Sequence, residues 1–169
     1  KLMIGWHRGD ITPPRNVLVQ GQFHRRISDG VISPLTATAL ALEVCGDDGS
    51  VDQVVFLSCD LCSEGFKADL LRELGDRCAG LDTSKLTVNT THTHNGPSLT
   101  RGVHEEPEDD PEFMNPDEYR LWLAVQLADI VATAWEIRQP GGMARGFGYA
   151  VVGRCRRAVY ADGSAQMYG

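Results

Sequence analysis

The chain has 169 residues, enough for one domain with its own hydrophobic core. Its hydrophobic content of 42% is typical of a globular protein and excludes a disordered polar segment. The formal net charge is −7, but six carboxylates lie within residues 105–112, so the remainder is close to neutral. There is no basic stripe of the kind that phosphate backbones require, which argues against a nucleic-acid partner.

The five cysteines, at positions 45, 59, 62, 78 and 155, are odd in number and widely spaced. This spacing is unlike a secreted disulfide scaffold and favours a reducing, cytoplasmic compartment. The longest apolar run, 121–135, is interrupted by Gln126 and Asp129 and is too short to cross a bilayer. Neither a transmembrane segment nor a signal peptide is predicted.

The first half of the chain alternates strand and helix patterns. Apolar runs predict strands over 2–6, 35–44 and 54–57, the last two joined by a turn at Gly46–Gly49. A helix is predicted over 64–77, capped by Ser63, with Phe66, Leu70 and Leu74 along one face. A strand over 85–91 follows. The order strand, helix, strand indicates a βαβ unit, and hence an α/β fold with a mixed sheet and flanking helices.

The second half begins with the clearest helix signal. Asn115 provides an N-cap and Pro116 the first helical position, which predicts a helix to Arg138. Its expected buried residues are Leu123, Leu127, Val131 and Trp135. A strand over 144–152 should follow, then a hairpin of 158–160 and 166–168 closed by Asp162-Gly163. Because the pattern stops at Gly169 within a strand, we expect residues 1–169 to be one α/β domain and part of a larger catalytic domain.

Two polar segments have competing interpretations. Residues 21–30, with Arg25 and Arg26, favour a surface loop over a substrate contact. The acidic run Glu105–Glu112 favours a solvated loop over a calcium cluster, because calcium loops need a defined order of ligands that it lacks. Its closeness to the histidines described next would also allow it to act as a mobile lid.

The main candidate site is the stretch 86–97, LTVNTTHTHNGP. Alternate side chains of a strand leave the same face, so His92 and His94 are expected side by side, ahead of the turn at Asn95-Gly96-Pro97. Two imidazoles at a strand end indicate a metal or acid–base site, although two ligands do not complete a zinc site. Spacing alone allows both histidines to bind metal.

Cys59 and Cys62 form the chief rival to the histidines. A C-x-x-C between a strand and a helix is typical of redox pairs, whereas two cysteines packed as small hydrophobes are the favoured alternative. Asp60 lies at the same strand end and is predicted to orient an imidazole or a water molecule. The arginines at 154, 156 and 157 fit a solvated turn and an anion site equally well.

Several of these segments, taken in order, resemble the neutral/alkaline ceramidase family. The segments are Gly9–Pro14 (GDITPP), Ser33-Pro34-Leu35 leading into 37–42, VVFLSCDL and THTHNGP. The resemblance covers most of the chain up to Pro97. Asn95 stands where the family has serine, and Ile32-Ser33 where it has a His-Asp pair.

The resemblance implies a zinc-dependent amidohydrolase that cleaves the N-acyl amide of ceramide or a related lipid-like amide. It assigns His92 as a zinc ligand and His94 as a catalytic residue beside the substrate. Arg156 is the match for an active-site arginine of the family and is assigned as a catalytic residue, with Cys155 replacing the preceding asparagine. The remaining family ligands lie later than position 169, so the rest of the catalytic domain is an expected partner. A thiol redox or metal-binding module using Cys59 and Cys62, and a non-catalytic binding domain, remain as alternatives.

Overall fold

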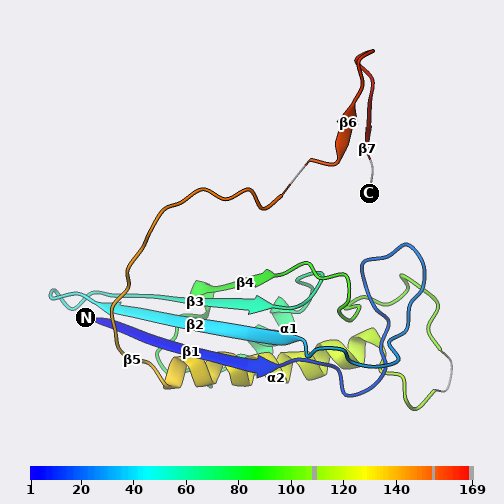
Figure 1. The fold of residues 1–169 in the computed structure, drawn as a ribbon. Helices are drawn as coiled ribbons and strands as arrows, with labels where there is room; N and C mark the ends of the chain where they lie inside the picture. Colours follow the sequence, from blue (N-terminus) through cyan, green and yellow to red (C-terminus); the bar gives the residue numbers. More distant parts are fainter. Residues whose placement is uncertain (108–109, 154, 168–169) are drawn as a thin grey trace.

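The computed structural model describes residues 1–107, 110–153 and 155–167. Five strands form one sheet in the order β4-β3-β2-β1-β5, and two more form a separate hairpin (Figure 1). The elements are β1 (Leu2–Asp10), β2 (Thr36–Cys45), β3 (Val51–Cys59), α1 (Lys67–Leu74), the 3-10 helix η1 (Thr83–Lys85), β4 (Leu86–Thr90), α2 (Pro116–Glu136), β5 (Gln139–Pro140), β6 (Arg157–Val159) and β7 (Ala165–Met167).

The sheet is mixed, as the sequence predicted. β1 and β5 both run antiparallel to their neighbours, and β2 and β3 form the expected antiparallel hairpin. β4 is parallel to β3 and is reached through α1, which confirms the βαβ unit. The fold class is therefore α/β, with strands β1 and β3 longer than the apolar runs suggested.

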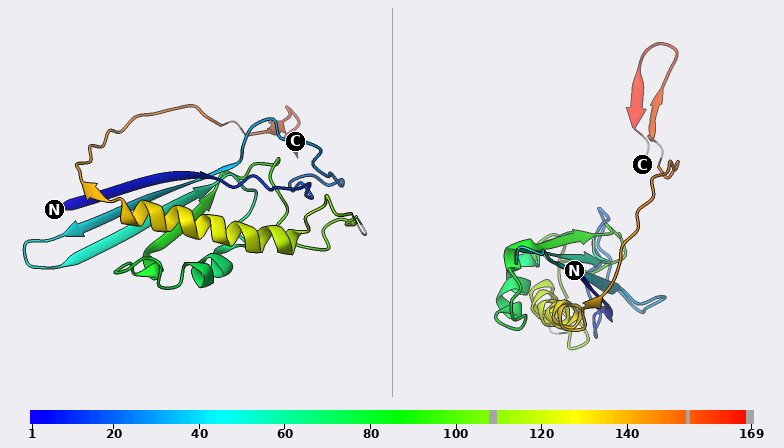
Figure 2. Two further views of the ribbon diagram at one scale, coloured as in Figure 1. Left: turned by 90° about the horizontal axis from the view of Figure 1, so that it is seen from below. Right: turned by 90° about the vertical axis from the view of Figure 1, so that its left-hand side faces the viewer.

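Both helices lie on the same side of the sheet, as the end-on view in Figure 2 shows. Small residues on this side allow α2 to pack closely against β1. An added β-carbon at Gly5 would overlap the carbonyl of Ala134, and one at Gly9 would lie 2.6 Å from the Ile130 side chain. The predicted buried face of α2, with Leu123, Leu127, Val131 and Trp135, is confirmed.

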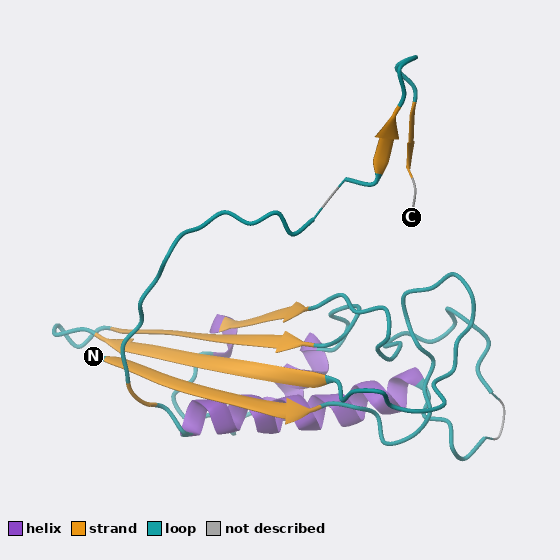
Figure 3. Cartoon of the chain, in the orientation of Figure 1, coloured by secondary structure: helices purple, strands orange, loops and turns teal. Residues whose placement is uncertain are grey.

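The opposite side of the sheet has no helix over it among the described residues (Figure 3). Trp6, Leu40 and Phe56 lie next to one another in register there, with Trp6 59% exposed and Phe56 45% exposed. The central strands are thus apolar on both faces, a pattern typical of sheets that are covered on both sides.

The two helices begin differently. Asn115 is the expected N-cap of α2, and together with Glu118 it forms a capping box. The predicted cap of α1 is wrong: the helix begins at Lys67, and its N-cap residue Phe66 makes no side-chain cap hydrogen bond. Ser63 instead hydrogen-bonds the Gln20 side chain at 3.3 Å, so tertiary contact has overridden the local capping preference.

The segment after β5 leaves the sheet and ends in the β6–β7 hairpin (Figure 1). The hairpin and its turn, with Gly163 at φ +81°, are confirmed, although Tyr168 lies outside the described residues. The predicted strand over 144–152 is wrong. This stretch pairs with no described strand, and Gly146 and Gly148 weaken its strand preference. None of the described helices is both long and apolar enough to cross a membrane.

Candidate metal centre

The candidate site lies where the two parallel strands end. Cys59, the last residue of β3, is in register with Thr90, the last residue of β4. The loop after β4 is hydrogen-bonded to the end of β3, because the Thr91 amide donates to the Cys59 carbonyl at 3.0 Å. The carboxyl ends of parallel strands therefore bring residues 59–62 and 91–97 together, the usual place for ligands in α/β folds.

His92 and His94 meet at this edge, but not through strand alternation. β4 ends at Thr90, and His92 has φ +57°, the one positive φ of a non-glycine residue in the described part of the chain. The ring centroids are 4.9 Å apart and the two Nε2 atoms are 3.3 Å apart. The expected pairing is present, and a left-handed residue rather than a strand produces it. Such conformations concentrate at functional sites.

The orientation of the His92 ring is fixed by a backbone carbonyl in the loop that follows β3. Its Nδ1 lies 2.7 Å from the Cys62 carbonyl oxygen, so Nδ1 carries the proton and donates it. Nε2 is then unprotonated, and its lone pair faces His94. A ligating histidine commonly donates its second ring N–H to a carbonyl in this way.

The donor set fits a zinc ion. Two nitrogens bound to one tetrahedral zinc at about 2.0–2.1 Å lie about 3.3 Å apart, which is the separation of the two Nε2 atoms, so the geometry allows an ion on both imidazoles as well as an ion on His92 with His94 beside it. Cys62 Sγ and one nitrogen from each histidine lie within 4.8 Å of one another, the one such cluster found among the described residues. No comparable cluster arises from the described part of the acidic run; Glu108 and Asp109 lie outside it.

The two cysteines of the C-x-x-C have different surroundings. Cys59 is fully buried on the helix side of the sheet, and burial, with the nearby Asp60 carboxylate, raises the pKa of its thiol to about 12. Cys62 Sγ lies 3.7 Å from His92 Nδ1. Both thiols are free. A redox pair needs a readily ionised attacking thiol, so the environment of Cys59 gives the redox alternative no support.

Asp60 contacts the residue before His92. Its carboxylate accepts from the Thr36 amide at 3.0 Å and hydroxyl at 2.8 Å, and from the Thr91 hydroxyl at 3.3 Å. These bonds connect the start of β2 to the turn that carries the histidines. A direct role of Asp60 in orienting an imidazole or a water molecule stays a prediction.

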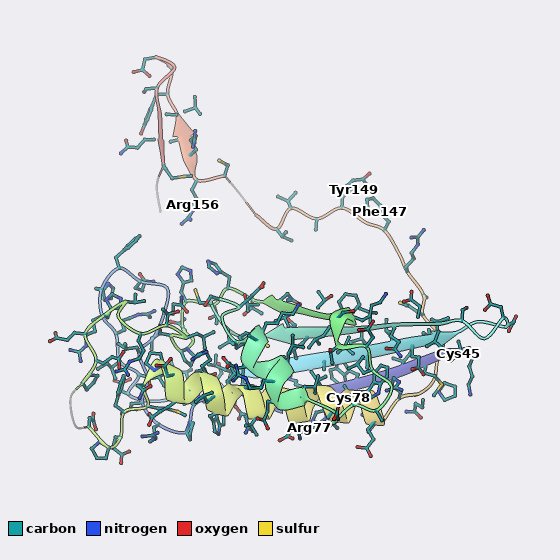
Figure 4. The ribbon with its side chains drawn as sticks, turned by 180° about the vertical axis from the view of Figure 1, so that it is seen from behind. Cys45, Arg77, Cys78, Phe147, Tyr149 and Arg156 are labelled. Carbon is teal, nitrogen blue, oxygen red and sulfur yellow. The ribbon has the colours of Figure 1, made fainter. Side chains whose placement is uncertain are left out.

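Arg156 is not brought to the histidines. It lies in the segment that leaves the sheet, just before β6, as Figure 4 shows. Its assignment as a catalytic residue stays a prediction, and its neighbour at position 154 lies outside the described residues.

Two residues of the 21–30 segment contact the site, although the sequence favoured a surface loop there and indicated neither contact. The Arg26 guanidinium donates to the His94 carbonyl and, at 3.1 Å, to the Asn95 side chain. Gly21 packs against the His94 side chain. Both lie some 70 residues before the histidines, so no local pattern connects them. This segment is thus more than a surface loop.

A pocket of about 820 Å³ adjoins the histidine turn. Thr93, Asn95 and Arg26 line it, together with apolar residues such as Val17 and Ile27. The imidazoles themselves do not line it. The pocket lies next to the candidate metal centre, and its lining combines apolar residues with charged groups of both signs, such as Arg26 and Asp29.

No family model and no curated protein matches this chain. Among solved structures, it is similar to the neutral ceramidase from Pseudomonas aeruginosa, with 19% identity and a TM-score of 0.62. A ceramidase structure complexed with C2 gives 19% identity and a TM-score of 0.57. The chain has the fold of one part of ceramidase. Both matches cover 83% of this chain and 22% of the other, so the chain spans about a fifth of the ceramidase length. The resemblance read from the motifs is confirmed at the level of the fold.

Proposed function

We propose that this chain contributes part of the active site of a zinc-dependent amidohydrolase of the ceramidase type. The reaction is hydrolysis of the N-acyl amide of ceramide, or of a related lipid-like amide, to a carboxylic acid and an amine. One observation carries the proposal: the Nε2 atoms of His92 and His94 face each other at 3.3 Å while the Cys62 carbonyl fixes the His92 tautomer.

In this proposal His92 holds the ion through Nε2, and its Nδ1–H continues to donate to the Cys62 carbonyl. A bound zinc ion supplies Lewis acidity toward the amide carbonyl and lowers the pKa of its water. His94 is exposed beside His92, where its imidazole can accept a proton from the attacking water and return it to the leaving amine. Arg156 is proposed to stabilise the developing negative charge, as the resemblance implies.

Two further observations support a functional site at the histidine turn. The left-handed φ of His92 is a local conformational cost of about 1–3 kcal/mol, which is characteristic of positions that serve catalysis or ligand binding. The similarity in fold to one part of neutral ceramidase supports the same assignment.

The test uses the longest natural form of the protein with an N-acyl sphingosine as substrate. Fatty acid release and bound zinc are measured for the wild type, His92→Ala, His94→Ala and the control His24→Ala, whose side chain is exposed on the 21–30 segment. We expect His92→Ala to lose both zinc and turnover, and His94→Ala to keep zinc while turnover falls by about 100-fold or more.

Other outcomes separate the alternatives. Zinc without turnover on any amide would support a metal-binding domain without this activity. Loss of zinc in both histidine variants would make His94 a ligand instead of a catalytic residue. Wild-type protein that neither retains zinc nor releases fatty acid would contradict the proposal and favour a non-catalytic binding role.

A further inference from the structure

Cys62 is the third side chain of the cluster and has no role in the proposal so far. Its thiol is free and its side chain is 8% exposed. Sγ lies 3.7 Å from His92 Nδ1, and the three potential ligand atoms of Cys62, His92 and His94 lie within 4.8 Å of one another.

The thiol is not placed to act as a nucleophile activated by His92. That activation needs an unprotonated ring nitrogen facing the sulfur. Here the near nitrogen is Nδ1, and its proton is committed to the Cys62 carbonyl at 2.7 Å. His92 therefore cannot take the thiol proton through this atom.

A role as a small core hydrophobe also fits Cys62 less well than it fits Cys59. Cys59 is completely buried within the hydrophobic core between the sheet and the helices. Cys62 lies outside that core cluster and next to two exposed imidazoles. Thiolate and imidazole together are a common donor pair for zinc.

We infer that Cys62 supplies a thiolate ligand to the ion held by His92. Sulfur and nitrogen on one tetrahedral zinc lie about 3.6 Å apart, given a Zn–S bond of about 2.3 Å and a Zn–N bond of about 2.0–2.1 Å. The three ligand atoms of the cluster lie within 4.8 Å of one another, and rotation about the Cα–Cβ bond of Cys62 can bring Sγ nearer to the ion. Binding releases the thiol proton to solvent and involves no oxidation or reduction.

This inference rests on the proposed metal at His92 but not on the hydrolytic activity. A sulfur ligand would give the centre a preference for zinc, cobalt or cadmium over magnesium and calcium. It would also make this site differ from one built only of nitrogen and oxygen ligands.

The test is a cobalt(II) titration of the full chain, followed by absorption spectroscopy. Visible d–d bands report cobalt binding, and a near-ultraviolet sulfur-to-cobalt charge-transfer band reports a thiolate ligand. We compare the wild type with Cys62→Ser, Cys62→Ala and the control Cys45→Ser. Cys45 is the exposed last residue of β2 (Figure 4), at the opposite end of the β2–β3 hairpin from Cys59.

The expected result is a charge-transfer band in the wild type and Cys45→Ser that is missing in both Cys62 variants. As a second readout, zinc should slow alkylation of Cys62 by iodoacetamide by about tenfold or more and leave Cys45 unaffected, as followed by peptide mass spectrometry.

Two results would overturn the inference. If the d–d bands appear without the charge-transfer band, and zinc leaves Cys62 alkylation unchanged, the metal proposal stands and Cys62 is not a ligand. If folded wild-type protein shows neither band with cobalt, the metal proposal fails as well. Far-ultraviolet circular dichroism verifies that each variant is folded.

Discussion

Gly21 and His94 are in direct contact, although 72 positions separate them in the chain. A β-carbon at position 21 would come within 2.6 Å of the His94 β-carbon and 2.8 Å of its α-carbon. Gly21 also has φ +104°, a conformation that residues with a side chain rarely adopt. Glycine at this position therefore allows the His94 turn to lie against the 21–30 segment.

Gly21→Ala should displace His94 and leave His92 in place. We expect fatty acid release to fall by about 100-fold, because a shift of about 1 Å in a catalytic group has effects of this size, while zinc binding at His92 persists. Gly30→Ala is the matched control, since no atom lies within 4 Å of its added β-carbon. Equal turnover by the two variants would contradict a positioning role for Gly21.

The Arg26 side chain binds the same turn, mainly through backbone carbonyls. Its guanidinium donates to the carbonyls of His94 and Gln20 and to the Asn95 side chain. Replacing it with glutamine should lower the free energy of unfolding by about 1.5–3 kcal/mol, the usual range for hydrogen bonds that involve a charged group.

The measurement is urea unfolding of Arg26→Gln beside Arg25→Gln, its exposed neighbour. We also expect kcat to fall more than KM in the Arg26 variant, because the displaced group is His94 rather than a substrate contact. A variant as stable and as active as the Arg25 control would show that these hydrogen bonds do not position the turn.

Burial of Cys59 predicts a loss of stability at alkaline pH. The pKa of its thiol rises from 9.0 to about 12, so the folded state holds the proton more tightly than the unfolded state. The stabilisation is complete below about pH 9 and is lost as the pH rises toward 12. Above pH 9 the free energy of unfolding should fall by about 1.4 kcal/mol for each pH unit from this group.

Urea unfolding between about pH 7 and about pH 11 would measure this dependence in the wild type and in Cys59→Ala. The variant should show a shallower alkaline decline. It should not be flat, because burial also raises the pKa of Tyr119. Identical slopes in the two proteins would mean that Cys59 does not titrate across the unfolding transition.

Local patterns in the sequence predicted much of the fold. The N-cap at Asn115 and the apolar face of α2 are short-range features, so their prediction succeeded. The βαβ order was predicted from apolar runs of strand length on either side of a segment with helical apolar spacing. The predicted strand over 144–152 failed, because its apolar residues are interrupted by glycines and no described strand pairs with them.

The site was only partly predictable. The H-x-H spacing identified His92 and His94, but their meeting depends on the positive φ of His92, which the sequence does not show. The C-x-x-C pattern paired Cys62 with Cys59, whereas the fold places Cys62 beside the histidines. Gly21 and Arg26 act through contacts made only when distant segments pack together. A glycine and an arginine in a polar loop carry no signal of that kind.

The zinc content of the full chain tests the central claim most directly. Wild-type protein, His92→Ala and His24→Ala are loaded with zinc, dialysed, and measured by inductively coupled plasma mass spectrometry. The account predicts about one zinc ion per chain in the wild type and in His24→Ala, and close to none in His92→Ala. Zinc retained equally by all three proteins, or absent from all three, would contradict a metal centre at His92.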